Sequence, residues 1–256
     1  MKKININGLS VKYNIYSPGG NVTALVLNND YDFKIKKMIN NYILNKFSFV
    51  EQVGFIKNNS LEMAGGEFCI NAARCAIYYL YQNDKKLKIN ILGKELLGKV
   101  NKNYVSIKYD INKKIDELVY KINNDYLINL DGISLLFLNK VENNLLLEQI
   151  NNNIKELIKE RIKKIDSKSK ALGIVLTDKN KIYPFIWVKE IDTFYFESAC
   201  GSASIAYALL NDDNNIKEYI VRQPSGYDVK IRINKIKNII KNIEFNGFVE
   251  EIKERR

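Results

Sequence analysis

The chain has 256 residues, of which 46% are hydrophobic and 27% charged, with a formal net charge of +11 and three cysteines. These values predict a globular protein with a sizeable core, and no run of eighteen apolar residues suggests a membrane span. The start of the chain lacks the apolar core of a signal peptide, and three cysteines do not make a disulfide framework. We therefore expect a reduced, cytoplasmic protein with no membrane partner.

The chain contains no histidine. This excludes Ser-His-Asp and Cys-His nucleophile pairs and every histidine-based metal site, and dispersed cysteines without Cys-x-x-Cys predict no zinc. The many lysines are mixed with asparagine and isoleucine and form no aromatic-interleaved patch, so we expect no nucleic-acid partner. Proton chemistry near neutral pH must then use a perturbed cysteine, glutamate, aspartate or lysine.

Alternation and turn residues predict the elements in chain order. In the first half we expect a helix over 33–45, turns at Gly93 and Gly98, and strands over 2–8, 11–16, 22–27, 51–56, 61–63, 88–92 and 104–109. The second half begins near residue 123, and we expect one long amphipathic helix over 143–165. Its strands are expected over 126–132, 134–138, 172–177, 182–189, 218–222, 227–233 and 239–249, and residues 193–196 are expected to lead into the second cysteine helix.

A cysteine opens a run of small and apolar residues twice in the chain. Cys69-Ile70-Asn71-Ala72-Ala73 aligns with Cys200-Gly201-Ser202-Ala203-Ser204, and a glutamate lies just upstream of each. The two cysteines are 131 residues apart, about half the chain, so the repeat predicts two similar halves, residues 1–122 and 123–245. Each run reads as a tight loop that feeds the N-terminus of a buried helix.

A thiol at a helix N-terminus lies among unpaired N–H groups and the positive end of the helix dipole, so we expect it to be more acidic than a free cysteine. Two such thiols facing each other create a site where a carboxylate binds between the helix ends. One thiolate can then remove a proton from the bound carbon while the other thiol returns one on the opposite face. This chemistry inverts a stereocentre without a cofactor.

The three cysteines could also serve other roles. Cys75 has no partner in the repeat and is expected to be a small buried hydrophobic residue. A disulfide oxidoreductase usually shows a close Cys-x-x-Cys pair, which the chain lacks. A carboxylate-binding module would use the same two helix ends without needing sulfur, and this alternative stays open.

At these motifs the sequence resembles the diaminopimelate epimerase superfamily of cofactor-independent racemases. A closer resemblance, to the histidine racemases of opine-metallophore biosynthesis, is carried by five stretches: 17–23, 51–56, 66–69, 197–202 and 223–226. The resemblance implies an α+β fold of two pseudo-symmetric halves, each a β-barrel-like sheet around a central helix. It also implies that residues 246–256 return to the first half.

The resemblance implies that Cys69 and Cys200 are the two catalytic bases of an amino-acid racemase that needs no metal and no cofactor. It implies backbone donors at Ile70, Asn71, Gly201 and Ser202, and ligand contacts at Asn21, Glu51, Gln52, Asn71 and Glu197. The expected partner is a small amino acid, with histidine favoured. Racemisation or epimerisation of another basic amino acid or of a diaminopimelate-type substrate stays open, and so does a homodimer.

Departures from the superfamily pattern bear on the substrate. The diaminopimelate enzymes carry a Glu-Arg pair where this chain has Ile191 and Asp192, so a distal carboxylate would lack its cationic partner. The available acids suit an imidazole or ammonium side chain instead; they are Glu51, Glu62, Asp192 and Glu197. Ile70 replaces the usual glycine after the first cysteine and is expected to narrow the pocket.

Overall fold

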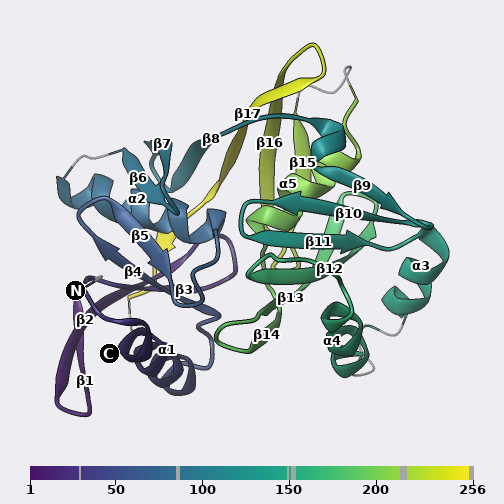
Figure 1. Cartoon of the computed structure of the whole chain (residues 1–256). Coiled ribbons are helices and arrows are strands. Elements are labelled where there is room, and N and C mark those ends of the chain that lie inside the picture. Colours follow the sequence, from purple (N-terminus) through teal and green to yellow (C-terminus); the bar gives the residue numbers. More distant parts are fainter. Residues whose placement is uncertain (29, 85–86, 149, 151–153, 214–217, 254–256) are drawn as a thin grey trace.

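The computed structural model describes residues 1–28, 30–84, 87–148, 150, 154–213 and 218–253. Two similar halves lie side by side, each built of strands around one central helix (Figure 1). No helix of these described ranges is both long enough and apolar enough to cross a membrane.

Apart from one strand that was not predicted, the first half follows the predicted order of elements. Its helices are α1 (Phe33–Lys46) and α2 (Ile70–Asp84), and α1 begins where the Asp32 carboxylate accepts the Ile35 N–H at 2.8 Å. Its strands are β1 (Lys2–Ile6), β2 (Leu9–Ser17), β3 (Thr23–Val26), β4 (Gln52–Lys57), β5 (Ser60–Met63), β6 (Lys88–Ile91), β7 (Lys94–Asn101) and β8 (Tyr104–Lys114).

A single 3-10 turn (Ile115–Glu117) leads into the second half. Its helices are α3 (Lys140–Glu148), α4 (Lys155–Lys163) and α5 (Gly201–Leu210). Its strands are β9 (Val119–Ile122), β10 (Asp125–Leu130), β11 (Ile133–Phe137), β12 (Ala171–Asp178), β13 (Lys181–Val188), β14 (Thr193–Phe196), β15 (Tyr219–Arg222), β16 (Asp228–Ile236), β17 (Ile239–Phe248) and β18 (Glu250–Glu251).

The strand pairing of the first half is repeated in the second. The parallel pair β3–β4 corresponds to β11–β12, and the parallel pair β5–β6 corresponds to β13–β15. The antiparallel run β6–β7–β8 corresponds in the same way to β15–β16–β17. This repetition, with α2 and α5 at equivalent places, confirms the predicted fold of two pseudo-symmetric halves.

The halves are not separate sheets. Strand β8 pairs with β17 in antiparallel fashion from Tyr104 opposite Phe248 to Lys114 opposite Ile239, which joins all strands into one continuous sheet. Strand β18 pairs with β2, with Glu250 opposite Ser17 and Glu251 opposite Tyr16. The division at residues 122 and 123 and the return of residues 246–256 remain proposals, and residues 254–256 lie outside the described ranges.

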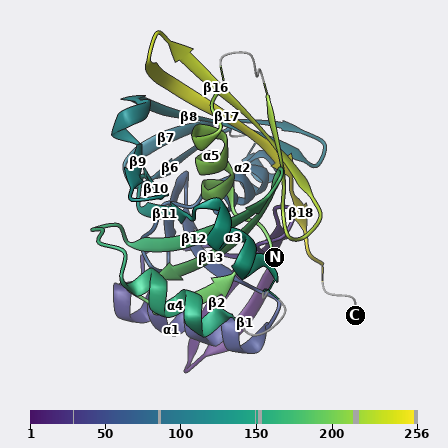
Figure 2. The ribbon, with the colours of Figure 1, turned by 90° about the vertical axis from the view of Figure 1, so that its right-hand side faces the viewer.

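The two central helices share one core. Apolar side chains of α2 and α5, including Ile77 and Ile205, are fully buried in the largest hydrophobic cluster. Figure 2 shows both helices in the middle of the molecule, surrounded by strands. The N-terminal ends of both helices therefore belong to the interior rather than to an outer face.

Two predictions about elements were wrong. The helix expected over 143–165 is two helices, α3 and α4, although Leu146, Ile154, Ile158 and Ile162 still pack in one cluster against the second half of the sheet. Between them Ile150 and Ile154 lie in turns, and residues 149 and 151–153 lie outside the described ranges. The apolar stripe runs through both helices, which is why the sequence pattern predicted a single one.

Gly98 was expected in a turn but lies within β7. A Cβ atom at this position would lie 2.6 Å from Cγ2 of Ile77 on α2, so the glycine allows the helix to pack closely on the strand. Strands β7 and β9 were not predicted.

Candidate active site

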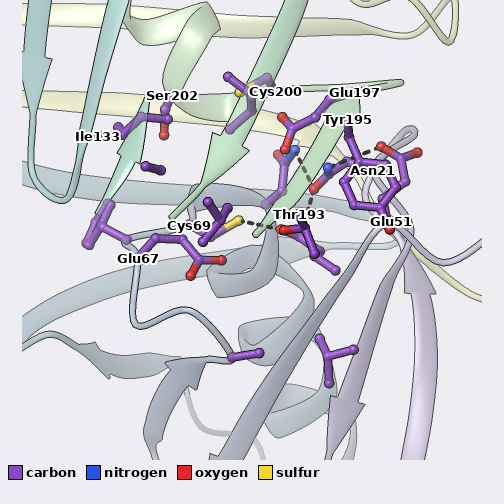
Figure 3. Close-up of a pocket in the computed structure, with 18 of the residues that line it drawn as sticks. Asn21, Glu51, Glu67, Cys69, Ile133, Thr193, Tyr195, Glu197, Cys200 and Ser202 are labelled. Atoms are coloured by element: carbon purple, nitrogen blue, oxygen red, sulfur yellow. Dashed lines mark hydrogen bonds between the residues drawn. The ribbon is translucent and has the colours of Figure 1, made fainter. Parts of the chain in front are cut away.

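A cavity of about 630 Å³, its open mouth included, lies where α2 and α5 begin. Both halves line it, and Figure 3 shows Cys69 and Cys200 in the same cavity. The structure brings all ten predicted site residues to its wall: Asn21, Glu51, Gln52, Cys69, Ile70, Asn71, Glu197, Cys200, Gly201 and Ser202.

The two helix N-termini abut at the cavity. Helix α2 begins directly after Cys69, and Cys200 is the N-cap residue of α5, with an extended backbone. A Cβ atom on Gly201 would lie 2.8 Å from both Cβ and Cγ2 of Ile70. The first N–H groups of both helices therefore meet at one place, which is a natural site for an anionic group.

This contact predicts that Gly201→Ala lowers activity, because the added methyl group collides with Ile70 and separates the two helix ends. We expect a loss of about tenfold or more in kcat/KM, since small misplacements of catalytic groups are costly. The double variant Ile70→Gly with Gly201→Ala removes the collision and should recover much of the loss. Steady-state kinetics of the three proteins test this, and a double variant no better than Gly201→Ala would contradict the steric explanation.

Three amides connect the first cysteine to the second half. The Gln52 amide donates to Oδ1 of Asn21 and to Oγ1 of Thr23. The Asn71 amide donates to Oδ1 of Asn21 at 3.4 Å and to the Ala199 carbonyl at 3.2 Å. The Cys69 thiol in turn donates to Oε1 of Gln52 at 3.2 Å and accepts the Ala72 N–H at 3.4 Å. The sulfur of Cys69 is thus held by the same network that spans the cavity.

Arg74 also holds this network in place, a role that the sequence motifs did not predict. Its fully buried guanidinium donates to the Pro18 carbonyl at 2.8 Å, to Oδ1 of Asn71 at 3.0 Å and to the Phe248 carbonyl at 3.3 Å. No carboxylate pairs with it among the described residues. Arg74 fixes the Asn71 amide and places a positive charge, unpaired among the described residues, near the start of α2.

The second cysteine is held differently. Its N–H donates to Oε1 of Gln223 at 2.9 Å, and Nε2 of Gln223 donates to Oγ of Ser204 at 2.9 Å. Its neighbour Ser198 donates through both its N–H and its hydroxyl to Glu51, the former at 3.1 Å. Glu51 thereby ties the first half to the loop that precedes α5.

Burial raises the pKa of the acids in the cavity. The pKa of Glu197 rises to about 8, chiefly through burial, with the negative charges of Glu51 and Glu67 adding to the shift. The pKa of Glu67 rises to about 7 through burial, opposed by nearby N–H groups and by the charge of Lys170. These acids therefore hold protons at a pH where exposed glutamates are ionised.

The expectation of acidic thiols was wrong for this protein. Burial raises the pKa of Cys69 to about 12, with Glu197 and Glu67 adding to the shift, while the Ala72 N–H and Gln52 oppose it. The pKa of Cys200 is also raised well above its ordinary value by burial and by the adjacent Glu197 carboxylate. Desolvation and neighbouring carboxylates thus outweigh the helix N-termini.

Two of the acids thought available to a substrate lie elsewhere. Glu62 pairs with Lys36 at 2.6 Å, and Asp192 accepts the Trp187 indole N–H at 2.7 Å. Neither lines the cavity, whereas Glu67, Thr193 and Tyr195 do, and these three were not predicted. Glu67 could have been found, because the repeat places it just upstream of Cys69 as Glu197 lies upstream of Cys200.

The third cysteine lies in the core, as expected. Cys75 is fully buried in the cluster around α2. All three cysteines are free thiols. Within the described ranges, no three cysteine or acidic side chains are grouped in a way that would hold a metal ion.

Solved structures with the same fold include racemases. The chain superimposes on a probable proline racemase from Agrobacterium radiobacter with a TM-score of 0.58 at 8% identity, covering 94% of this chain and 91% of that one. It superimposes on a phenazine biosynthesis protein of the PhzF family from Enterococcus faecalis with a TM-score of 0.55 at 12% identity, covering 96% and 98%. These similarities show that the fold is diaminopimelate epimerase-like.

Curated relatives narrow the class. The chain is 32% identical over 232 residues to a histidine racemase from Fusobacterium nucleatum, covering 82% of this chain and 85% of that protein. It is 23% identical over 243 residues to a histidine racemase from Staphylococcus aureus, covering 86% and 88%. Fold and relatives together define the chain as an amino-acid racemase that acts on a small amino-acid substrate.

A match to the model of a protein family shows the family of this chain. Residues 10–254 match the histidine racemase CntK N-terminal domain, which is nearly the whole chain. The chain belongs to this family.

Proposed function

We propose that the protein interconverts L- and D-histidine by a two-base mechanism in which Cys69 and Cys200 act on opposite faces of the α-carbon, without a cofactor. The observation that carries the proposal is the position of the two cysteines, each at the start of one of two abutting helices in a single cavity. The histidine racemases among its relatives support the choice of substrate. The three free thiols favour a reducing, cytoplasmic setting.

The substrate carboxylate would bind the N–H groups at the starts of α2 and α5, on Ile70, Asn71, Gly201 and Ser202. These donors are fixed before the reaction, so they stabilise the negative charge that spreads into the carboxylate when the α-proton leaves. The buried positive charge of Arg74 adds to this stabilisation. The ammonium group would face the polar side of the cavity, where Asn21, Glu51, Gln52 and Glu197 offer oxygen acceptors.

One cysteine must be a thiolate and the other a thiol when the reaction begins. The thiolate takes the α-proton and becomes a thiol, while the opposite thiol gives its proton to the carbon and becomes a thiolate. The reverse reaction exchanges the two roles. Because the negative charge of Glu197 adds to the raised pKa of Cys69, a substrate ammonium bound beside Glu197 would offset that charge and favour the thiolate.

Proton NMR in D2O tests the proposal. L-histidine incubated with the reduced protein should lose its α-proton signal, and D-histidine should appear on a chiral column. Ornithine, lysine, diaminobutyrate and diaminopimelate serve as alternative substrates. Exchange with one of these but not with histidine would retain the mechanism and correct the substrate, whereas no exchange with any of them would support a carboxylate-binding module.

A further inference from the structure

The cavity contains acids on two sides of Cys69. Figure 3 shows Glu51 and Tyr195 on one side of this cysteine and Glu67 on the other. Glu51 accepts two hydrogen bonds from Ser198 and a third from the Asn21 amide at 3.4 Å. The Glu51 carboxylate is therefore satisfied by the protein itself.

Glu67 differs from Glu51 in its hydrogen bonding. The residue is only 8% exposed, it lines the cavity, and its Oε2 atom has no hydrogen-bond partner among the described residues. A buried polar atom without a partner is costly, and such atoms are rare in folded proteins. Because Glu67 lines the proposed substrate cavity, a polar group of the bound amino acid can supply the missing partner.

The surroundings of Glu67 restrict the kind of group that it can meet. Oε2 lies 2.7 Å from the position that a Cβ atom on Gly65 would take, and Cγ1 of Val188 and Cγ1 of Ile191 lie 2.3 and 3.5 Å from the same point. Both apolar side chains also line the cavity, as do Ile186 and Ala171 from the same half. This part of the cavity offers one acceptor within an apolar wall, which suits a flat ring with a polar N–H edge.

A second buried acceptor supports the same interpretation. Asn40 of α1 is fully buried and lines the cavity, and its Oδ1 atom also has no partner in the described part of the chain. Its Nδ2 group is occupied by a hydrogen bond to Asn41 at 3.1 Å. The wall therefore contains two acceptors without donors, and a side chain that carries N–H groups supplies what they lack.

From these contacts we infer that Glu67 determines substrate specificity by accepting a hydrogen bond from a ring N–H of the substrate's imidazole. The inference rests on the proposed histidine racemase function and adds the residue that recognises the side chain. Aliphatic or aromatic amino acids without an N–H group would leave the Glu67 carboxyl group buried and unpaired. Sites of this kind reject such analogues strongly, because the unpaired group is penalised in the wrong complex.

The experiment compares two substrates that differ in this one group. In 3-(4-thiazolyl)alanine a ring sulfur replaces the Nε2–H group of histidine, while ring size and the rest of the molecule are kept. We expect the wild-type protein to prefer histidine, measured as the ratio of the two kcat/KM values. In Glu67→Met, which keeps the length of the side chain and removes the acceptor, this ratio should fall at least tenfold, mainly through a higher KM for histidine.

Two further variants complete the test. Glu67→Gln keeps an acceptor without the charge and should give an intermediate ratio, and it serves as a second probe if Glu67→Met folds poorly. Glu156→Gln on the exposed face of α4 changes the same side chain far from the cavity and should leave the ratio unchanged. A merely structural role of Glu67 would lower both kcat/KM values in parallel.

The outcomes separate this inference from the proposed function. An unchanged ratio in Glu67→Met, with histidine racemised by the wild-type protein, overturns the role of Glu67 and leaves the proposed function intact. A wild-type protein that does not racemise histidine overturns the proposed function itself. A ratio that falls at least tenfold in Glu67→Met and remains at the wild-type value in Glu156→Gln supports the assignment.

Discussion

Cys69→Ser and Cys200→Ser are each expected to lower the rate of histidine racemisation by roughly a thousandfold or more, while the protein still folds. A serine hydroxyl is a far weaker acid than a thiol, so it can neither act as the ionised base nor return a proton efficiently. Because each thiol serves one face of the α-carbon, either substitution should impair both directions of the reaction. Racemisation assays from both enantiomers, with circular dichroism to verify folding, measure the effect.

The third cysteine provides the matched control. Cys75→Ala removes a thiol only six residues from Cys69, but from the core rather than from the cavity. We expect it to retain most of the activity and to lose only a modest amount of stability. Full activity in Cys69→Ser or in Cys200→Ser would rule out the two-thiol mechanism.

Isotope incorporation distinguishes two bases from one. In D2O the D-histidine formed early from L-histidine should carry deuterium, because its α-proton comes from the opposite thiol, which exchanges with solvent. The remaining L-histidine should still carry protium. Equal early labelling of both enantiomers would indicate a single base that serves both faces.

Glu197→Gln should abolish most of the activity and yet make the protein more stable at alkaline pH. Glu197 has a pKa of about 8 in the folded protein, well above that of an exposed glutamate. The stability that the protonated Glu197 carboxyl group contributes to the folded protein is therefore fully present below about pH 4.5. It is lost progressively as the pH rises to about 8. At pH 9 the charged carboxylate should cost on the order of 3 kcal/mol, which the neutral amide avoids.

Thermal unfolding at two pH values measures the expected gain in stability. The melting temperature of Glu197→Gln should exceed that of the wild type by about 5 °C at pH 9, and the difference should nearly vanish at pH 5. Glu156→Gln, at an exposed position, should follow the wild type at both pH values. A variant that is less stable than the wild type at pH 9 would show that Glu197 is ionised and well paired in the folded state.

The sequence predicted the repeat, the two cysteine-led helices and several residues of the cavity wall, because the motifs that carry the chemistry are local. Cys69 and Asn71 lie in one stretch, and Cys200 and Ser202 in another, so their relative positions follow from the start of a helix. The resemblance supplied the residues that lie far away in the chain, such as Asn21 and Glu51. The structure then brings all of them into one cavity.

What the sequence could not supply are properties that depend on surroundings. The pKa of Cys69 depends on burial and on carboxylates from both halves, and a helix N-terminus alone suggested the opposite direction. Arg74 looked like one more motif residue, because only the folded chain brings the carbonyls of Pro18 and Phe248 to its guanidinium. Gly98 resembled a turn because the side chain that excludes a Cβ atom, Ile77, belongs to a different element.

The pairing of β8 with β17 determines how the cleft between the halves can move. Two bodies joined by a loose linker swing freely, whereas these halves are joined by two hydrogen-bonded strands that run across the gap (Figure 1). Any opening must bend or twist this ribbon, and the pairing is irregular between Ile240 and Asn242, which is where bending would concentrate. We therefore expect the cleft to open only by a small amplitude, because the paired strands resist bending.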